Sequence, residues 1–170
     1  MLRTCLSKDF RRTLNVKRRR FRQRSTLEKA LFIEAVVCLG VARLAIRFLP
    51  FCRIAPFLGR AMLETPNKSS PIVAPGLQVS WAVRTAGRYT PWESKCLAQA
   101  VAAKMMLKRR RLPSTLYLGL SKDGETGLCA HAWLRCGDRI LTGGPIHRHF
   151  TQIAAFGDTP GCPGGGSGSG

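Results

Sequence analysis

Cys96 and His131 are the two residues of this chain whose types and order best suit covalent catalysis. Cys96 lies in a stretch with helical spacing, and His131 lies farther along in an apolar stretch with strand-like alternation. A thiolate is a strong nucleophile, and an imidazole can take the thiol proton and later give it to a leaving group. The pair is therefore a candidate nucleophile and general base.

A helix is predicted over residues 90–111 as the element that carries Cys96. Thr90 and Glu93 form a capping box, and Pro91 takes the first helical position, where its missing N–H does no harm. Cys96 then falls within the first two turns, where the helix dipole favours a thiolate and backbone N–H groups can support an oxyanion. Taken alone, Cys96 would be interpreted as a small buried residue. Its combination with a downstream histidine favours a catalytic role instead.

After Pro113 the apolar spacing changes from helical to alternating, which predicts a small sheet. Polar turns separate the strands, including a tight turn at Gly137 and Asp138. The predicted strands cover residues 115–120, 128–135 and 139–142. N-terminal helices followed by a small antiparallel sheet predict the α+β class.

The longest predicted helix begins at Ser25, which forms a capping box with Glu28, and stops before Pro50. Its apolar part, residues 31–49, contains three ionisable side chains: Glu34, Arg43 and Arg47. Each would cost about 2.5 to 3.5 kcal/mol at membrane depth on insertion scales. A buried amphipathic helix is therefore preferred over a membrane span.

Three shorter segments complete the helical half. Residues 50–60 resemble a short helical piece broken by Pro56 and Gly59, and residues 64–76 are rich in Pro, Ser and Asn, which predicts a loop. Residues 77–86 return to helical spacing, and Gly87 is a suitable C-terminal glycine.

The charge of the chain is strongly basic, with 28 Lys and Arg against 9 Asp and Glu and a formal net charge of +19. Residues 1–24 hold ten basic residues and one acidic residue, a net +9, so about half of the excess lies in a short arm. Such charge favours an acidic partner, whether nucleic acid, anionic lipid or an acidic peptide. At 170 residues and 45% hydrophobic content we expect one domain over 25–157, between the arm and a Gly/Ser/Pro tail at 158–170 that looks like a linker.

The seven cysteines are odd in number and include no Cys-x-x-Cys pair. No hydrophobic secretory segment follows the basic start, so we expect free thiols in a reducing, cytoplasmic compartment. The closest spacing, Cys129 to Cys136, makes a weak zinc candidate together with His131, and small apolar fillers in a sheet are the preferred interpretation. No metal or cofactor is expected.

Three stretches share their pattern with one known family: Pro91-Trp92 with Cys96-Leu97, Leu116 to Leu120, and Ala130-His131-Ala132-Trp133. With the helical stretch 41–50, they closely resemble the transglutaminase-like, papain-like cysteine peptidases that mature lasso peptides. The resemblance covers about residues 25–156. It implies a transglutaminase-like peptidase core in which Cys96 is the nucleophile and His131 the general base and acid.

This resemblance also implies a role and partners. Members of the family remove the leader from a ribosomally made precursor peptide before an ATP-dependent, asparagine-synthetase-like cyclase closes the lasso ring. Residues 1–24 are too short for a precursor-recognition domain, so the resemblance implies a standalone peptidase that works with a separate leader-recognition protein. The basic arm or the cluster Arg109–Arg111 could face that partner or an acidic leader.

The sequence departs from the family pattern at the third catalytic residue, the one that orients the histidine. The family places an Asp for this role on the strand after the histidine. Asp138 falls at the hairpin tip, about 16 Å from His131 at strand rise, and cannot orient it. The remaining options are Thr142, a backbone carbonyl and the distant Asp158.

Four further residues have polar or aromatic side chains that could belong to the site. His147 and His149 belong to a predicted surface loop. Trp133, which with Trp92 is expected to pack the catalytic helix against the sheet, is favoured as core. Gln78 is a weakly supported oxyanion donor.

Two other functions remain open from the sequence. One is a basic nucleic-acid-binding protein with a non-catalytic Cys96, which would show salt-steep binding. Against it, basic and aromatic residues do not interleave on any strand pattern, and the resemblance implies no nucleic-acid partner. The other is an acyl-transferring relative of the same fold, whose thioester an amine resolves instead of water.

Overall fold

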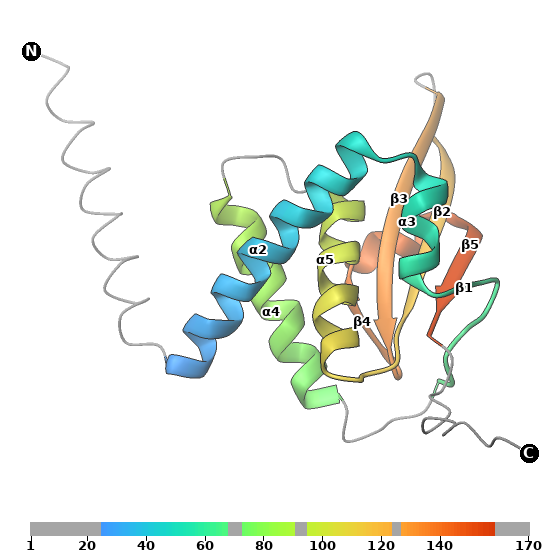
Figure 1. Ribbon diagram of the computed structural model, residues 1–170. Coiled ribbons are helices and arrows are strands. Elements are labelled where there is room, and N and C mark those ends of the chain that lie inside the picture. Colours follow the sequence, from blue (N-terminus) through green and yellow to red (C-terminus); the bar gives the residue numbers. More distant parts are fainter. Residues whose placement is uncertain (1–24, 68–72, 91–94, 124–126, 159–170) are drawn as a thin grey trace, which may run out of the picture.

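The computed structural model describes residues 25–67, 73–90, 95–123 and 127–158, so the basic arm and most of the tail lie outside the described residues. Within these ranges the chain forms helices first and then an antiparallel sheet, which confirms the α+β class (Figure 1). The helices are α2 Thr26–Phe48, α3 Phe51–Leu58, α4 Val73–Tyr89, α5 Cys96–Arg109 and the 3-10 helix η1 Pro145–His149. The strands are β1 Arg60–Ala61, β2 Thr115–Asp123, β3 Gly127–Cys136, β4 Arg139–Thr142 and β5 Thr151–Gly157.

The sheet has five strands in the order β1-β5-β2-β3-β4, and every neighbouring pair is antiparallel. The three predicted strands are present, and β2 and β3 are longer than expected. Strand β5, which lies between β1 and β2 in the sheet, was not predicted. It pairs with β2, a strand about 30 residues earlier in the chain, and no tight turn in the sequence marks where it begins.

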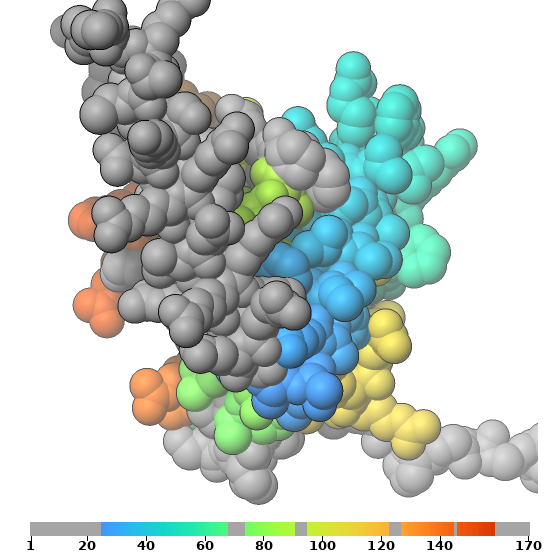
Figure 2. All heavy atoms as spheres, turned by 90° about the vertical axis from the view of Figure 1, so that its left-hand side faces the viewer, coloured from blue at the N-terminus to red at the C-terminus, as the bar shows by residue number. Residues whose placement is uncertain are grey.

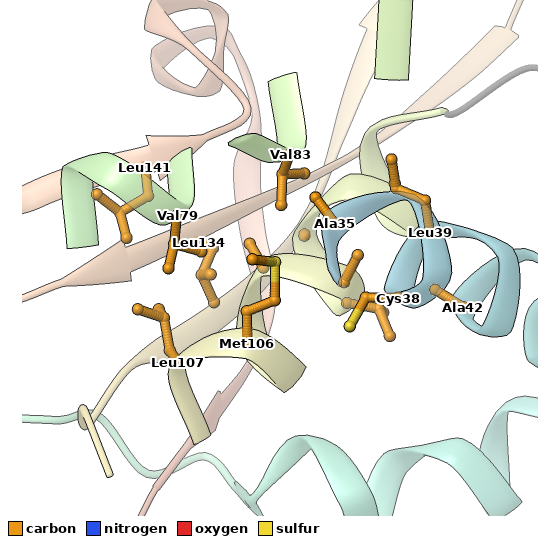
Figure 3. Close-up of a cluster of buried hydrophobic side chains, with 14 of the residues drawn as sticks. Ala35, Cys38, Leu39, Ala42, Val79, Val83, Met106, Leu107, Leu134 and Leu141 are labelled. Atoms are coloured by element: carbon orange, nitrogen blue, oxygen red, sulfur yellow. The ribbon is translucent and has the colours of Figure 1, made fainter. Parts of the chain in front are cut away.

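The helices α2, α4 and α5 lie on one side of the sheet (Figure 1). Helix α5 is the central one, because it contacts α2 and α4 on one side and β2, β3 and β4 on the other. Figure 3 shows Leu39, Val83, Met106 and Leu134 from these layers converging in one buried cluster. Nearly every side of α5 is covered, so its first residue is held in a fixed position.

Helix α2 begins as predicted at a capping box. The hydroxyl of Ser25 accepts from the Glu28 N–H at 3.2 Å, and the Glu28 carboxylate accepts from the Ser25 N–H at 3.2 Å. The helix ends at Phe48, just before Pro50. No helix among the described residues is long and apolar enough to cross a membrane.

The outer side of α2 is also apolar, which the amphipathic interpretation missed. Along α2 a row of apolar side chains is spaced three or four residues apart and is 47 to 73% exposed: Ile33, Val37, Val41, Leu44 and Phe48. In Figure 2, which turns this side of the molecule to the viewer, α2 lies at the surface in blue. The helix thus buries one apolar stripe and leaves a second one at the surface.

Three predicted helix limits are wrong, although α3 does end before Gly59, as predicted. Helix α3 runs through Pro56, which is exposed, so the carbonyl that loses its N–H partner can be hydrated. Helix α4 starts at Val73, inside the predicted loop, because Pro75 occupies the first turn, where N–H groups are unpaired in any case. It also continues past Gly87 to Tyr89.

The arginines at the end of α5 are tied to α2. Both Arg109, at 3.2 Å, and Arg110, through two guanidinium nitrogens, contact the Glu34 carboxylate. The Arg110 hydrogen bond lowers the pKa of Glu34 from its ordinary value. At least two of the three arginines in this cluster therefore have a structural role.

Candidate active site

One cavity of about 300 Å³ brings Cys96 and His131 together. Cys96 comes from the start of α5, which covers one face of the sheet, whereas the His131 side chain alternates onto the other face with Trp133. The cavity that both residues line therefore lies at the β4 edge of the sheet. The remaining lining comes from α4, α5, β4 and the two glycines after it: Arg84, Gln99, Ile140, Leu141, Thr142, Gly143 and Gly144.

Cys96 is the first residue of α5, a more extreme position than predicted. Lys95, in extended conformation, is the N-cap, whereas the N–H of Thr90 bonds to Ala86 at the end of α4. The predicted capping box is therefore not the start of this helix, and its partner Glu93 lies outside the described residues. The first N–H groups of a helix lack intrahelical partners, and Lys95 provides no side-chain cap for them. Cys96 thus lies where the helix dipole is strongest.

His131 is 7% exposed, and its Nε2 lies 2.9 Å from the carbonyl oxygen of Gly143. A carbonyl can only accept a hydrogen bond, so Nε2 must carry the proton and donate. In the neutral ring Nδ1 is then the nitrogen with the free lone pair. The ring also packs against Trp133 and Phe150, with centroid separations of 6.1 and 4.9 Å. These contacts fix both the tautomer and the orientation of the ring.

Gly143 is held in a conformation that favours glycine, with φ of 92°. A Cβ at this position would lie 2.3 Å from the Cβ of Trp133. Regular extrapolation from the turn at Gly137 and Asp138 places Gly144, not Gly143, opposite His131. The paired part of β3 and β4 ends at Leu134 and Thr142, so the contact between the Gly143 carbonyl and the imidazole lies beyond this ladder.

The other candidates for the third member are placed differently. Thr142 lines the cavity and is 2% exposed, yet its hydroxyl has no hydrogen-bond partner in the described part of the chain. Asp138 occupies the hairpin turn, as predicted. Asp158 accepts hydrogen bonds from the Lys104 ammonium and from Ser114, both at 3.1 Å. It lies beyond the Gly157 end of β5, away from the cavity.

Trp133 is a core residue, as predicted, but it belongs to the sheet face turned away from the helices. It is 5% exposed and stacks on Tyr117 at a centroid separation of 5.5 Å. The expectation that it packs the catalytic helix against the sheet is wrong, because the alternate residues Ala132 and Leu134 do so. Trp92 lies outside the described residues.

The two later histidines lie in η1, not in an irregular loop. His149 is exposed, as expected. The half-buried His147 lies against Trp133 at a centroid separation of 5.8 Å, and its Nδ1 is 2.7 Å from the Gly144 carbonyl. Neither lines the cavity.

Two cavity residues were missed by the sequence analysis. Gln99 follows Cys96 by one helical turn, and this i to i+3 spacing was a usable signal. Arg84 on α4 reaches the cavity only because α4 packs beside β4. Gln78, considered as an oxyanion donor, is exposed and does not line the cavity.

The weak zinc candidate is not supported by the arrangement of its three residues. Cys136 faces the helical core, whereas His131 and Cys129 alternate onto the opposite face of β3. Burial raises the pKa of the Cys136 thiol, which favours the protonated form that does not bind metal. Within the described ranges no group of three or more metal-ligating side chains occurs.

Comparison with protein families matches residues 35–155 to the Transglutaminase-like superfamily. This match spans most of the chain, including the cavity, and the chain belongs to that superfamily, which includes cysteine peptidases. No curated protein and no solved structure matches the chain significantly.

Proposed function

We propose that this protein is a cysteine peptidase that removes the leader from a lasso-peptide precursor. The observation that carries the proposal is that Cys96 at the start of α5 and an oriented His131 line one cavity. The superfamily supports the broader class, and the sequence pattern around Cys96 and His131 supports the finer role.

The geometry suggests an order of proton transfers. Because Nε2 of His131 donates to Gly143, Nδ1 is the nitrogen that takes the Cys96 thiol proton. The thiolate attacks the carbonyl between leader and core, and the N–H groups at the start of α5 stabilise the resulting oxyanion. The protonated imidazole then gives its proton to the leaving amine, which leaves a thioester.

Water completes the reaction in this proposal. His131, again neutral, takes a proton from the water that attacks the thioester, and the thiolate leaves and is reprotonated. No hydrogen bond joins Cys96 to His131 directly in the described part of the chain. Such contacts often tighten only when substrate binds.

Partners follow from the finer role. A separate leader-recognition protein would deliver the precursor, and an ATP-dependent asparagine-synthetase-like cyclase would close the ring on the released core. The strongly basic chain suits an acidic leader or partner surface, since opposite charge accelerates encounter.

Cleavage of a lasso-peptide precursor, sought among the short reading frames beside the gene, tests the proposal. The synthetic peptide is incubated with the protein and its leader-recognition partner, and product masses are measured. Cys96→Ala and His131→Ala should abolish cleavage while melting curves show an intact fold. Cys52→Ala is the matched control, because Cys52 is exposed and distant in sequence from the cavity residues. Cleavage by either cavity variant would refute the mechanism.

The same measurement separates the alternatives. An acyl-transferring relative would yield a peptide joined to an amine, which differs in mass from the hydrolysed peptide. A nucleic-acid-binding protein would bind DNA or RNA with steep salt dependence and would be indifferent to the Cys96→Ala change.

A further inference from the structure

Strand β3 has neighbours of very different length. On one side β2 pairs with β3 from Gly127 to Arg135 without a register shift. On the other side β4 pairs only with residues 134–136. Among the described residues, positions 127–133 of β3 therefore have no strand partner on the β4 side.

The geometry around Gly143 shows which backbone groups face this open edge. A Cβ on Gly143 would lie 3.0 Å from the carbonyl oxygen of Ala132, so that oxygen points toward the chain that follows β4. In a regular antiparallel strand alternate residues direct both N–H and C=O to the same side. The regular pairing with β2 thus places the N–H and C=O of Leu128 and Ala130 on the open edge as well.

The open edge leads directly to the cavity. Leu128 and Ala130 are exposed, and the next residue along β3 is His131, which lines the cavity with Cys96. Gly143 and Gly144 border the cavity without side chains that would block the approach, and a Cβ on Gly144 would meet no atom within 4 Å. A chain that continued along this edge would therefore arrive at the candidate nucleophile.

We infer that the open edge of β3 binds an extended segment of the peptide substrate as an added strand, which guides the scissile bond to Cys96. The inference rests on the proposed peptidase function and names how that site recognises its substrate. The ligand class is an unfolded peptide held through its backbone, and Leu128 to Ala130 offer about 7 Å of edge at strand rise before Gly143 covers Ala132. Side-chain selectivity along this edge is expected to be low.

A proline on the edge tests the inference. In Ala130→Pro the lost N–H faces outward, so the hydrogen bonds between β2 and β3 should survive. We expect kcat/KM for the synthetic leader–core precursor to fall about tenfold or more, mainly through KM, as befits loss of edge hydrogen bonds. Alkylation of Cys96 by iodoacetamide should keep its rate, because this small reagent needs no strand.

Ile153→Pro is the matched control. Ile153 is exposed and unpaired at the irregularity between β5 and β2, away from the cavity. Unchanged kcat/KM in folded Ala130→Pro, or an equal loss in Ile153→Pro, would overturn the inference. So would a concentration-dependent dimer that Ala130→Pro abolishes, since the edge would then serve a second copy.

Amide hydrogen exchange measures binding of the peptide independently of its cleavage. In Cys96→Ala mixed with the same precursor, the amides of Leu128 and Ala130 should gain protection, whereas that of Cys129, already directed at β2, should not. No added protection at Leu128 and Ala130 refutes strand addition even if the peptide is cleaved. Protection there without cleavage by the wild-type protein would instead leave the edge site standing and refute the peptidase role.

Discussion

The Nε2 atom of His131 and the carbonyl oxygen of Gly143 are 2.9 Å apart, and this contact orients the candidate base by backbone alone. The family pattern places a carboxylate in that role, and the sequence supplies none at a suitable position. A carbonyl at hydrogen-bond distance holds the same tautomer, so the missing Asp does not leave the imidazole free to turn.

Replacing Gly143 by Ala should impair the site more than the fold. The new Cβ would meet the Cβ of Trp133 and would force Gly143 out of its positive φ, which moves the carbonyl from His131. A displacement of about 1 Å can cost on the order of 100-fold in rate, and precursor cleavage by mass spectrometry would measure it. Gly76→Ala is the control, because Gly76 lies in α4 outside the cavity lining and a Cβ there would make only ordinary contacts of 3.5 Å or more. Full activity in Gly143→Ala would contradict the orienting role.

Thr142→Val distinguishes the carbonyl from the hydroxyl as the third member. The Thr142 hydroxyl is buried without a partner in the described residues, so its removal should raise the free energy of unfolding by about 1 kcal/mol. Cleavage should be retained. Urea denaturation and a cleavage assay on one preparation supply both readings, and loss of cleavage in a stable variant would assign the role to Thr142.

The two apolar sides of α2 predict opposite outcomes for the same substitution. Leu39 is fully buried and Leu44 is 59% exposed. Leu39→Ala should cost about 2 to 5 kcal/mol through lost burial and a cavity, whereas Leu44→Ala should stay within about 0.5 kcal/mol. Equal losses in urea denaturation would show that something covers the outer side.

Glu34 links α2 and α5 in a pH-dependent way. Its folded pKa is lowered, chiefly by the Arg110 hydrogen bond, so its contribution to stability is present above the ordinary value of 4.5. That contribution is lost as pH falls through the lower folded pKa. Glu34→Gln should therefore be less stable than wild type at pH 6, and the gap should shrink in strongly acidic buffer. Denaturation at several pH values checks this, and a gap that widens on acidification would contradict it.

Local signals predicted most of the elements. The Ser25 and Glu28 capping box and the turn at Gly137 and Asp138 are satisfied by neighbours in sequence, so a short window suffices to find them. Strand β5 and the exact start of α5 depend instead on packing between distant segments, which such windows do not contain.

For the candidate site, too, the sequence predicted what local residue types and spacing can indicate and missed what depends on packing. Residue types were sufficient to select Cys96 and His131, and helical spacing from Cys96 would have added Gln99. The sequence left a backbone carbonyl open as the third member without naming Gly143, because this contact lies beyond the paired residues of β3 and β4. A backbone carbonyl has no side-chain signature, so residue types cannot select it.

The backbone contact to His131 has a consequence for acid tolerance. An orienting carboxylate can be neutralised by acid, which loosens the imidazole before the fold itself fails. The Gly143 oxygen has no proton to gain over the same range, so buffer acidity cannot switch off the contact through its acceptor. Loss of this orientation in acid would therefore require a change of the backbone around Gly143, not protonation of its oxygen.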